Sequence, residues 1–165
     1  MTNKILATVI LLGIIFASCQ NKPKADNAQQ KDSQTTESQI ETNNIDIPYT
    51  IATNYFVKNT VSQIDNPKIE TAEKFNEIFG MATTMGKDGK PTEIDFSKQF
   101  VIALILPETD LLTTIKPISL QKINNEITFN YSLEVGAKQT FMSRPSMAVV
   151  VDKKEDGNVT LKEVK

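Results

Sequence analysis

The residue types that carry most catalytic chemistry are scarce in this chain. Its 165 residues include one cysteine, Cys19, and no histidine or tryptophan. Without histidine there is no general base with an ordinary pKa near neutrality, no Ser-His-Asp or Cys-His triad, and no histidine-containing zinc site. Only carboxylate or lysine chemistry remains for catalysis, so we expect the protein not to be an enzyme.

Ser119 and Lys122 have the S-x-x-K spacing of penicillin-recognising enzymes. In that motif the two side chains share one face of a helix. Residues 115–123 predict a strand, on which an odd spacing places two side chains on opposite faces. The accompanying S-D-N and K-T-G motifs are absent from the sequence, so we interpret this spacing as structural.

Two further sets of residues have features of metal sites. Asp152, Asp156 and Asn158 suggest calcium, but Lys154 occupies a position where an EF-hand needs an acid, and a hairpin turn is favoured. Four methionines are candidate copper(I) ligands, although methionine more often fills a core: Met81, Met85, Met142 and Met147. We therefore predict neither a metal nor another cofactor.

Arg144, the chain's only arginine, is a candidate partner-binding residue. A guanidinium beside an aromatic side chain can anchor an anionic group or a carboxylate of a partner. The alternative that we favour is an internal ion pair. Glu108 and Asp110 are candidates for a general acid and base, but solvated charges after a strand are the favoured interpretation.

Residues 81–94 predict a long loop, and its polar, turn-prone tip carries Lys87 and Asp88. Long loops in compact domains are sometimes functional, so these two residues are further candidates for partner binding. A loop without a function of its own explains the same residues equally well.

Cys19 follows a segment with the features of an export signal. Lys4 provides a positive start, residues 5–16 are apolar, and the small residues Ala17 and Ser18 precede the cysteine. An apolar helix of about twelve residues reaches roughly 18 Å, short of the roughly 30 Å hydrocarbon core, so it is not a membrane span. We predict a lipoprotein signal peptide at 1–18 and a diacylglyceryl thioether on Cys19. The alternative is an ordinary secretory signal.

Residues 19–46 are mainly polar and predict a disordered tether with a reach of roughly 30 Å. The formal charge of −2, from 18 basic and 20 acidic residues, favours neither nucleic-acid binding nor a polybasic membrane patch. Gln20 stands where well-studied lipoproteins carry the aspartate that favours inner-membrane retention. The resemblance to those signals implies a lipid anchor in the cell envelope, in the outer membrane.

Residues 47–165 predict one α+β domain. Alternation indicates a strand at 49–58, helical spacing indicates a helix at 71–80 with Thr71 as N-cap and Gly80 after its end, and a continuous apolar run indicates a doubly buried strand at 100–106. Two hairpins follow, 115–123 with 126–134 and 146–152 with 159–164. We expect one short helix packed on a curved, mainly antiparallel sheet of about five to seven strands.

This order resembles the C-terminal domain of PrcB-type envelope lipoproteins. The similarity includes the Phe-rich helix, the Asp-Phe-Ser segment at 95–97 before the apolar strand, and the Pro-led strand at 145–153. The resemblance implies a non-catalytic accessory domain that binds an envelope protein, and one implied role is stabilisation of a surface protease complex. The alternative function is small-ligand binding or catalysis in a pocket under the 81–94 loop.

Overall fold

The computed structural model describes residues 44–86 and 88–165. This part of the chain holds ten strands, one α-helix and one short 3-10 helix, so it is α+β as predicted. The strands form three sheets, whereas the sequence indicated one sheet with fewer strands. No helix among the described residues is long and apolar enough to span a membrane.

The outer sheet has the order β1-β7-β8-β10: β1 (Ile45–Asp46), β7 (Thr109–Ile123), β8 (Glu126–Ser143) and β10 (Asn158–Glu163). The central sheet has the order β2-β9-β6-β4: β2 (Thr50–Ile51), β9 (Ser146–Asp152), β6 (Gln99–Ile105) and β4 (Lys68–Ile69). The small sheet pairs β3 (Tyr55–Val57) with β5 (Phe79–Met81). β1 lies at the end of the segment predicted to be a tether.

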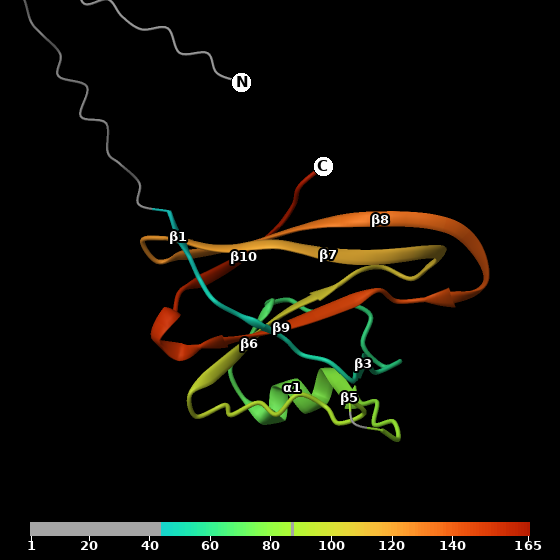
Figure 1. Cartoon of the computed structure of the whole chain (residues 1–165), viewed down its shortest axis with the longest axis horizontal. Coiled ribbons are helices and arrows are strands. Elements are labelled where there is room, and N and C mark those ends of the chain that lie inside the picture. The colour runs from blue at the N-terminus through green and yellow to red at the C-terminus, as the bar shows by residue number, and fades with distance from the viewer. Residues whose placement is uncertain (1–43, 87) are drawn as a thin grey trace, which may run out of the picture. The chain divides into compact units, whose positions relative to one another are not determined.

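The central sheet lies between the outer sheet and the helix α1 (Ala72–Ile78) (Figure 1). Alternate residues of β6 serve the two sides of this sheet, which confirms the doubly buried strand. Phe100 and Ile102 pack with side chains of β7 and β8. Val101 and Ala103 pack with α1 and β5. The outer sheet therefore provides the cover that the second face of β6 requires.

α1 begins as the sequence predicts but ends earlier. The Thr71 hydroxyl accepts a hydrogen bond from the Lys74 backbone N–H at 3.2 Å, and Phe75 and Ile78 bury one helix face. Phe79 is the C-cap of α1 and is already extended, so Gly80 follows the cap as predicted but lies in the strand β5. A side chain at Gly80 would collide with the Phe56 ring, and this explains a small residue there independently of the helix end.

The first hairpin is confirmed and is longer than predicted. β7 and β8 pair antiparallel across Asn124, whose φ of 55° asparagine tolerates in a tight turn. Ile127 and Phe129 are 0% and 1% exposed, as the alternation in β8 predicts. Both strands continue well past the predicted limits of 115 and 134.

Two strand predictions are wrong in their connections. The strand predicted at 49–58 is divided into β2 and β3 at Asn54, where φ is 61°. The second hairpin does not form, because the 3-10 helix η1 (Lys153–Glu155) carries the chain from the central sheet to the outer sheet. There β10 pairs parallel with β8, and Val159 and Leu161 pack against the core.

Candidate functional site

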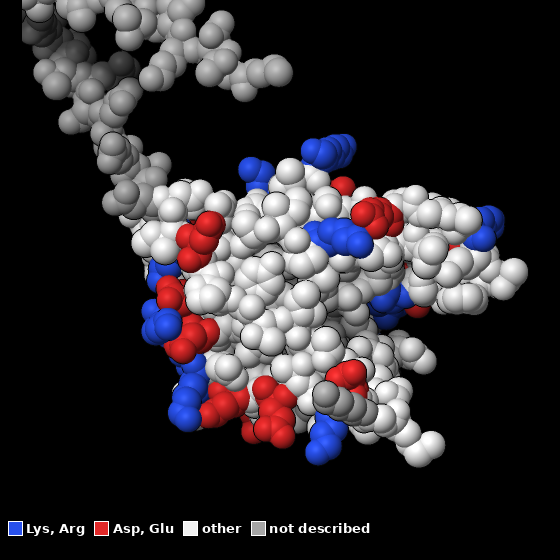
Figure 2. Space-filling model, viewed as in Figure 1, with Lys and Arg blue, Asp and Glu red and all other residues white. Residues whose placement is uncertain are grey.

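The ends of β7 and β8 far from their turn form a feature that we call the distal arm, residues 109–113 and 134–143. In Figure 1 this two-stranded ribbon extends sideways beyond α1 and the small sheet. In the view of Figure 2 its surface is mostly uncharged. Its exposed apolar side chains are Leu111 at 37%, Leu112 at 52%, and Val135, Phe141 and Met142 each at 59%. Contiguous apolar surface can mark an interaction site, so the arm is a candidate functional site.

Irregular pairing accompanies the exposure of Phe141 and Met142. Thr113 pairs with Val135, Leu111 with Lys138, and Thr109 with Ser143, so β8 uses more residues than β7 over the same stretch. Phe141 and Met142 are among the extra residues of β8, between Lys138 and Ser143. Because the ladder is interrupted there, these side chains no longer alternate between a buried and a solvated face.

A shallow groove runs along the inner face of the arm. It has a volume of about 380 Å³, and apolar side chains supply much of its wall: Leu106, Pro107, Leu111, Leu133, Val135 and Pro145. Glu108 and Glu163 lie at the same groove. Its composition, apolar with two carboxylates, suits a partner's apolar side chains better than it suits a reaction.

Arg144 makes the internal ion pair that the sequence analysis favoured. Its Nη2 lies 2.8 Å from Glu108 Oε1, its Nη1 donates to the Val61 carbonyl, and its side chain is only 16% exposed. Asp110 in turn pairs with Lys138 at 2.9 Å. The guanidinium thus joins the corner between β8 and β9 to residue 61, and it is already engaged within the chain.

The other candidate partner-binding residues lie on the 81–94 loop. Lys87 lies outside the described residues. Asp88 is exposed, and its carbonyl accepts a hydrogen bond from Asn54 Nδ2 at 2.7 Å. Thr92 is held by Thr53 through backbone and hydroxyl bonds, so the described loop residues are fastened at the break between β2 and β3.

A hollow of about 430 Å³ lies between this loop and α1. Tyr55, Phe75 and Phe96 contribute aromatic surface to it, and Lys90 and Glu93 are the charged residues at its wall. The Tyr55 hydroxyl already donates to the Thr92 carbonyl at 2.8 Å. This hollow lies where the alternative function, small-ligand binding or catalysis under the 81–94 loop, requires a pocket. Lys90 and Glu93 carry opposite charges, so the wall does not favour an ionic ligand of either sign.

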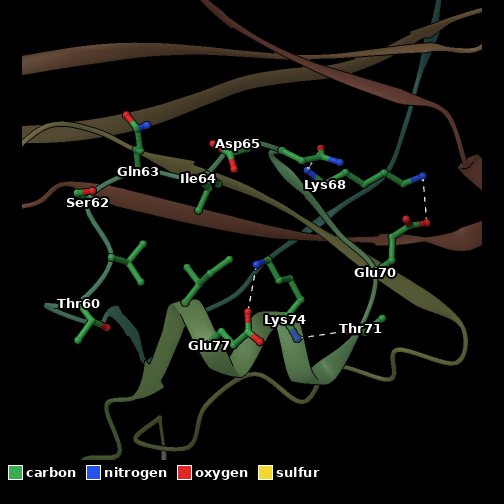
Figure 3. A pocket seen from close by; sticks show the side chains of 13 residues that line it. Thr60, Ser62, Gln63, Ile64, Asp65, Lys68, Glu70, Thr71, Lys74 and Glu77 are labelled. Atoms are coloured by element: carbon green, nitrogen blue, oxygen red, sulfur yellow. Dashed lines mark hydrogen bonds and ion pairs between the residues drawn. The ribbon is translucent and has the colours of Figure 1, made fainter.

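A larger hollow, of about 510 Å³, lies between α1 and residues 60–66 (Figure 3). Lys74 pairs with Glu77 at 3.1 Å and Lys68 pairs with Glu70 at 3.3 Å, as the dashed lines in Figure 3 mark. The charged walls therefore satisfy one another instead of converging on a common point, and the hollow gives no indication of a particular ligand.

Lys68 also anchors the loop after η1. Partial burial lowers the pKa of its ammonium, but hydrogen bonds to Asp156 and Glu70 outweigh that effect, and the net pKa is raised. The same hydrogen bond holds the pKa of Asp156 below its ordinary value of 3.8. Lys68 Nζ lies 5.2 Å from the centre of the Phe100 ring. Asp156 is therefore occupied in an internal pair.

The remaining sequence candidates are dispersed. Ser119 lies on a strand, and its Oγ accepts a hydrogen bond from Asn130 Nδ2 at 2.9 Å. Within residues 44–86 and 88–165 no three acidic or cysteine residues are grouped in a way that could hold a metal ion. Met147 packs against the core, whereas Met81, Met85 and Met142 are exposed. Cys19 lies outside the described residues.

Sequence reasoning missed the arm. The available signal was the pair of adjacent apolar residues in each strand, Leu111 with Leu112 and Phe141 with Met142. Two adjacent apolar residues cannot both face a core on one side of a strand.

Comparison of the chain with protein-family models, with curated proteins and with solved structures finds no match.

Proposed function

We propose that this protein is an envelope lipoprotein whose α+β domain binds another protein and has no catalytic activity. A diacylglyceryl group on Cys19 anchors it, in the outer membrane, through the polar segment 19–46. The domain acts as an accessory subunit, and stabilisation of an envelope protease complex is the role that the PrcB-type resemblance suggests.

The exposed apolar side chains of the distal arm are the observation that carries this proposal. Phe141 and Met142 are each 59% exposed on a ribbon that the core does not cover. Exposed apolar area of this kind costs solubility, and a partner that covers it recovers roughly 25 cal/mol for each Å². Aromatic side chains and methionine are also enriched at protein interfaces.

Crosslinking in native envelopes, followed by mass spectrometry, tests the binding role. We expect the double variant Phe141→Ser/Met142→Ser to recover at least tenfold less crosslinked partner protein than the unmodified protein does. Ile118→Ser is the matched control, because Ile118 is 51% exposed on β7 but lies outside the arm. Equal recovery of one partner by all three proteins contradicts the proposal.

Membrane attachment has its own test. Cys19→Ala should move the protein from the membrane fraction to the soluble fraction, and mass spectrometry of the mature protein should find an acylated N-terminal cysteine. A mature chain that retains residues 1–18 without a lipid contradicts the anchor, whatever the arm binds.

The hollow beneath the 81–94 loop supports a second candidate function, the binding of a small uncharged ligand. Its aromatic surface from Tyr55, Phe75 and Phe96 suits a flat apolar molecule. Native mass spectrometry of protein purified from its own envelope should then find a bound small molecule that Phe96→Ala releases. Recovery of that molecule together with no crosslinked protein reverses the ranking of the two functions.

A further inference from the structure

β10 pairs with only the first part of β8. The last paired residues are Glu163 and Tyr131, and the Val164 N–H then donates to the Tyr131 carbonyl at 2.7 Å. β8 itself continues to Ser143. Among the described residues, no strand is paired with β8 beyond this point on the side that β10 occupies.

The direction of the free backbone groups follows from that hydrogen bond. The Tyr131 carbonyl points toward β10, so in an antiparallel ladder Tyr131 and its partner Pro117 form a non-hydrogen-bonded pair. The ladder from Tyr131 to Val135 has no register shift. Backbone groups alternate along a strand, so Leu133 and Val135 direct their N–H and C=O groups to the free edge of β8.

The side chains of the same two residues line the arm's groove. Leu133 packs against the core, Val135 is 59% exposed, and both contribute to the groove wall. The backbone groups and the apolar surface are therefore presented together. An occupant must supply extended backbone and apolar side chains at alternate positions, which is the chemistry of strand addition.

The opposite edge of the ribbon, on β7 close to the arm, is less suited to this mode of binding. Pro117 on β7 has no N–H to offer, and a register irregularity follows it between Pro117 and Ser119. Proline and irregular pairing are devices that protect an edge strand from pairing with another chain. Leu133 and Val135 have no proline between or beside them.

The charge at the groove indicates one further property of the occupant. Glu108 is already paired with Arg144, whereas Glu163 makes no ion pair within the described part of the chain. Glu163 lies where β10 ends, next to the free edge. A basic side chain near one end of the added segment would therefore meet a carboxylate at the rim of the groove.

We propose that β8 receives an extended segment of the partner protein as an added strand where the arm begins, at Leu133 and Val135. The segment continues the row of β10, places alternate apolar side chains in the groove, and carries a lysine or arginine that meets Glu163. This inference rests on the proposed function, because it names how the accessory domain holds its partner.

The test uses the full mature protein and a synthetic octapeptide that alternates valine with threonine and begins with lysine. Bound peptide should slow the hydrogen exchange of the Leu133 and Val135 amides at least tenfold, as measured by nuclear magnetic resonance. The same peptide with methyl groups on alternate backbone nitrogens should not protect them, because it cannot complete the ladder.

Val135→Pro removes an edge N–H while it keeps an apolar side chain and leaves the bonds between β7 and β8 in place. We expect at least tenfold weaker binding of the octapeptide. Thr113→Pro is the matched control, since Thr113 pairs with Val135 and presents its N–H on the β7 edge. The comparison of the two peptides on the unmodified protein decides the question if Val135→Pro fails to fold.

The assignment to β8 is overturned if the unmodified octapeptide protects neither amide, if the methylated peptide binds equally well, or if Thr113→Pro abolishes binding and Val135→Pro does not. These outcomes are separable from failure of the proposed function. A crosslinked partner that depends on Phe141 and Met142, without strand addition, leaves a protein-binding arm that docks through side chains alone.

Discussion

The two halves of the β7–β8 ribbon are continuous in sequence and in backbone pairing, yet they have opposite environments. Near the turn, Ile127 and Phe129 are 0% and 1% exposed because they pack against the central sheet. In the distal arm, Val135 belongs to the same alternating series and is 59% exposed. The difference is the layer opposite, because β6 and β9 cover the first half and the arm extends past them (Figure 1).

This difference separates side chains that hold the fold from side chains that are free to bind. Burial of apolar surface stabilises a domain only where another layer excludes water from it. The apolar residues of the arm therefore contribute little to folding. Under the proposed function these side chains bind a partner, so mutations in the covered half should lower stability and mutations in the arm should lower binding.

Phe100→Ala should have the largest effect on stability. Phe100 is 0% exposed in the core between the central and outer sheets, and the Lys68 ammonium lies over its ring. Removal of a buried phenylalanine side chain leaves a cavity, and we expect a loss of about 3–5 kcal/mol in the free energy of unfolding. Chemical denaturation measures it. A loss below about 1 kcal/mol contradicts a core formed between the outer and central sheets.

Thr71→Ala should have the next largest effect, because it leaves the first turn of α1 without its cap. The Thr71 hydroxyl is the acceptor for the Lys74 N–H, and the change should cost about 1 kcal/mol in denaturation experiments. Thr71→Ser keeps the hydroxyl and should restore most of that loss. Equal destabilisation by both variants would show that the cap is not the cause.

Asp156→Asn should reveal the pair with Lys68 through its pH dependence. A hydrogen bond from Lys68 lowers the pKa of Asp156 in the folded state below its ordinary value of 3.8. The carboxylate therefore contributes to the free energy of unfolding above pH 3.8, and this contribution is lost as the pH falls through the lower pKa of the folded state. The carboxylate is exposed, so we expect only about 0.5–1 kcal/mol at neutral pH. Unfolding curves between pH 7 and acid should converge for the two proteins. Asp65→Asn, at another exposed carboxylate, is the control, and its free energy of unfolding should equal that of the unmodified protein at each pH.

Phe141→Ser should have the smallest effect on stability, although it replaces the same residue type as Phe100→Ala. Phe141 is 59% exposed in the irregular part of β8, so the free energy of unfolding should change by less than about 0.5 kcal/mol. The same denaturation experiment measures it. A loss of 2 kcal/mol or more would mean that the arm is part of the core and would remove the contrast between the two halves.

Local features of the sequence were sufficient for several elements. The unbroken apolar run predicts the doubly buried β6, Thr71 predicts the start of α1, and strict alternation predicts the buried face of β8 from Ile127. Each of these depends on residues a few positions apart. Connections between distant segments were harder, and the 146–164 hairpin was wrong because β9 and β10 belong to different sheets.

By itself, the sequence determined the α+β class, the main strands and the scarcity of catalytic residue types, because periodicity and composition are local properties. Only the tertiary structure decided which apolar side chains are covered. Coverage depends on where β6 and β9 end beneath the ribbon, and on β10 leaving β8 unpaired beyond Tyr131. A strand's own residues specify which face is apolar, but only the neighbouring layer determines whether that face is core or exposed surface.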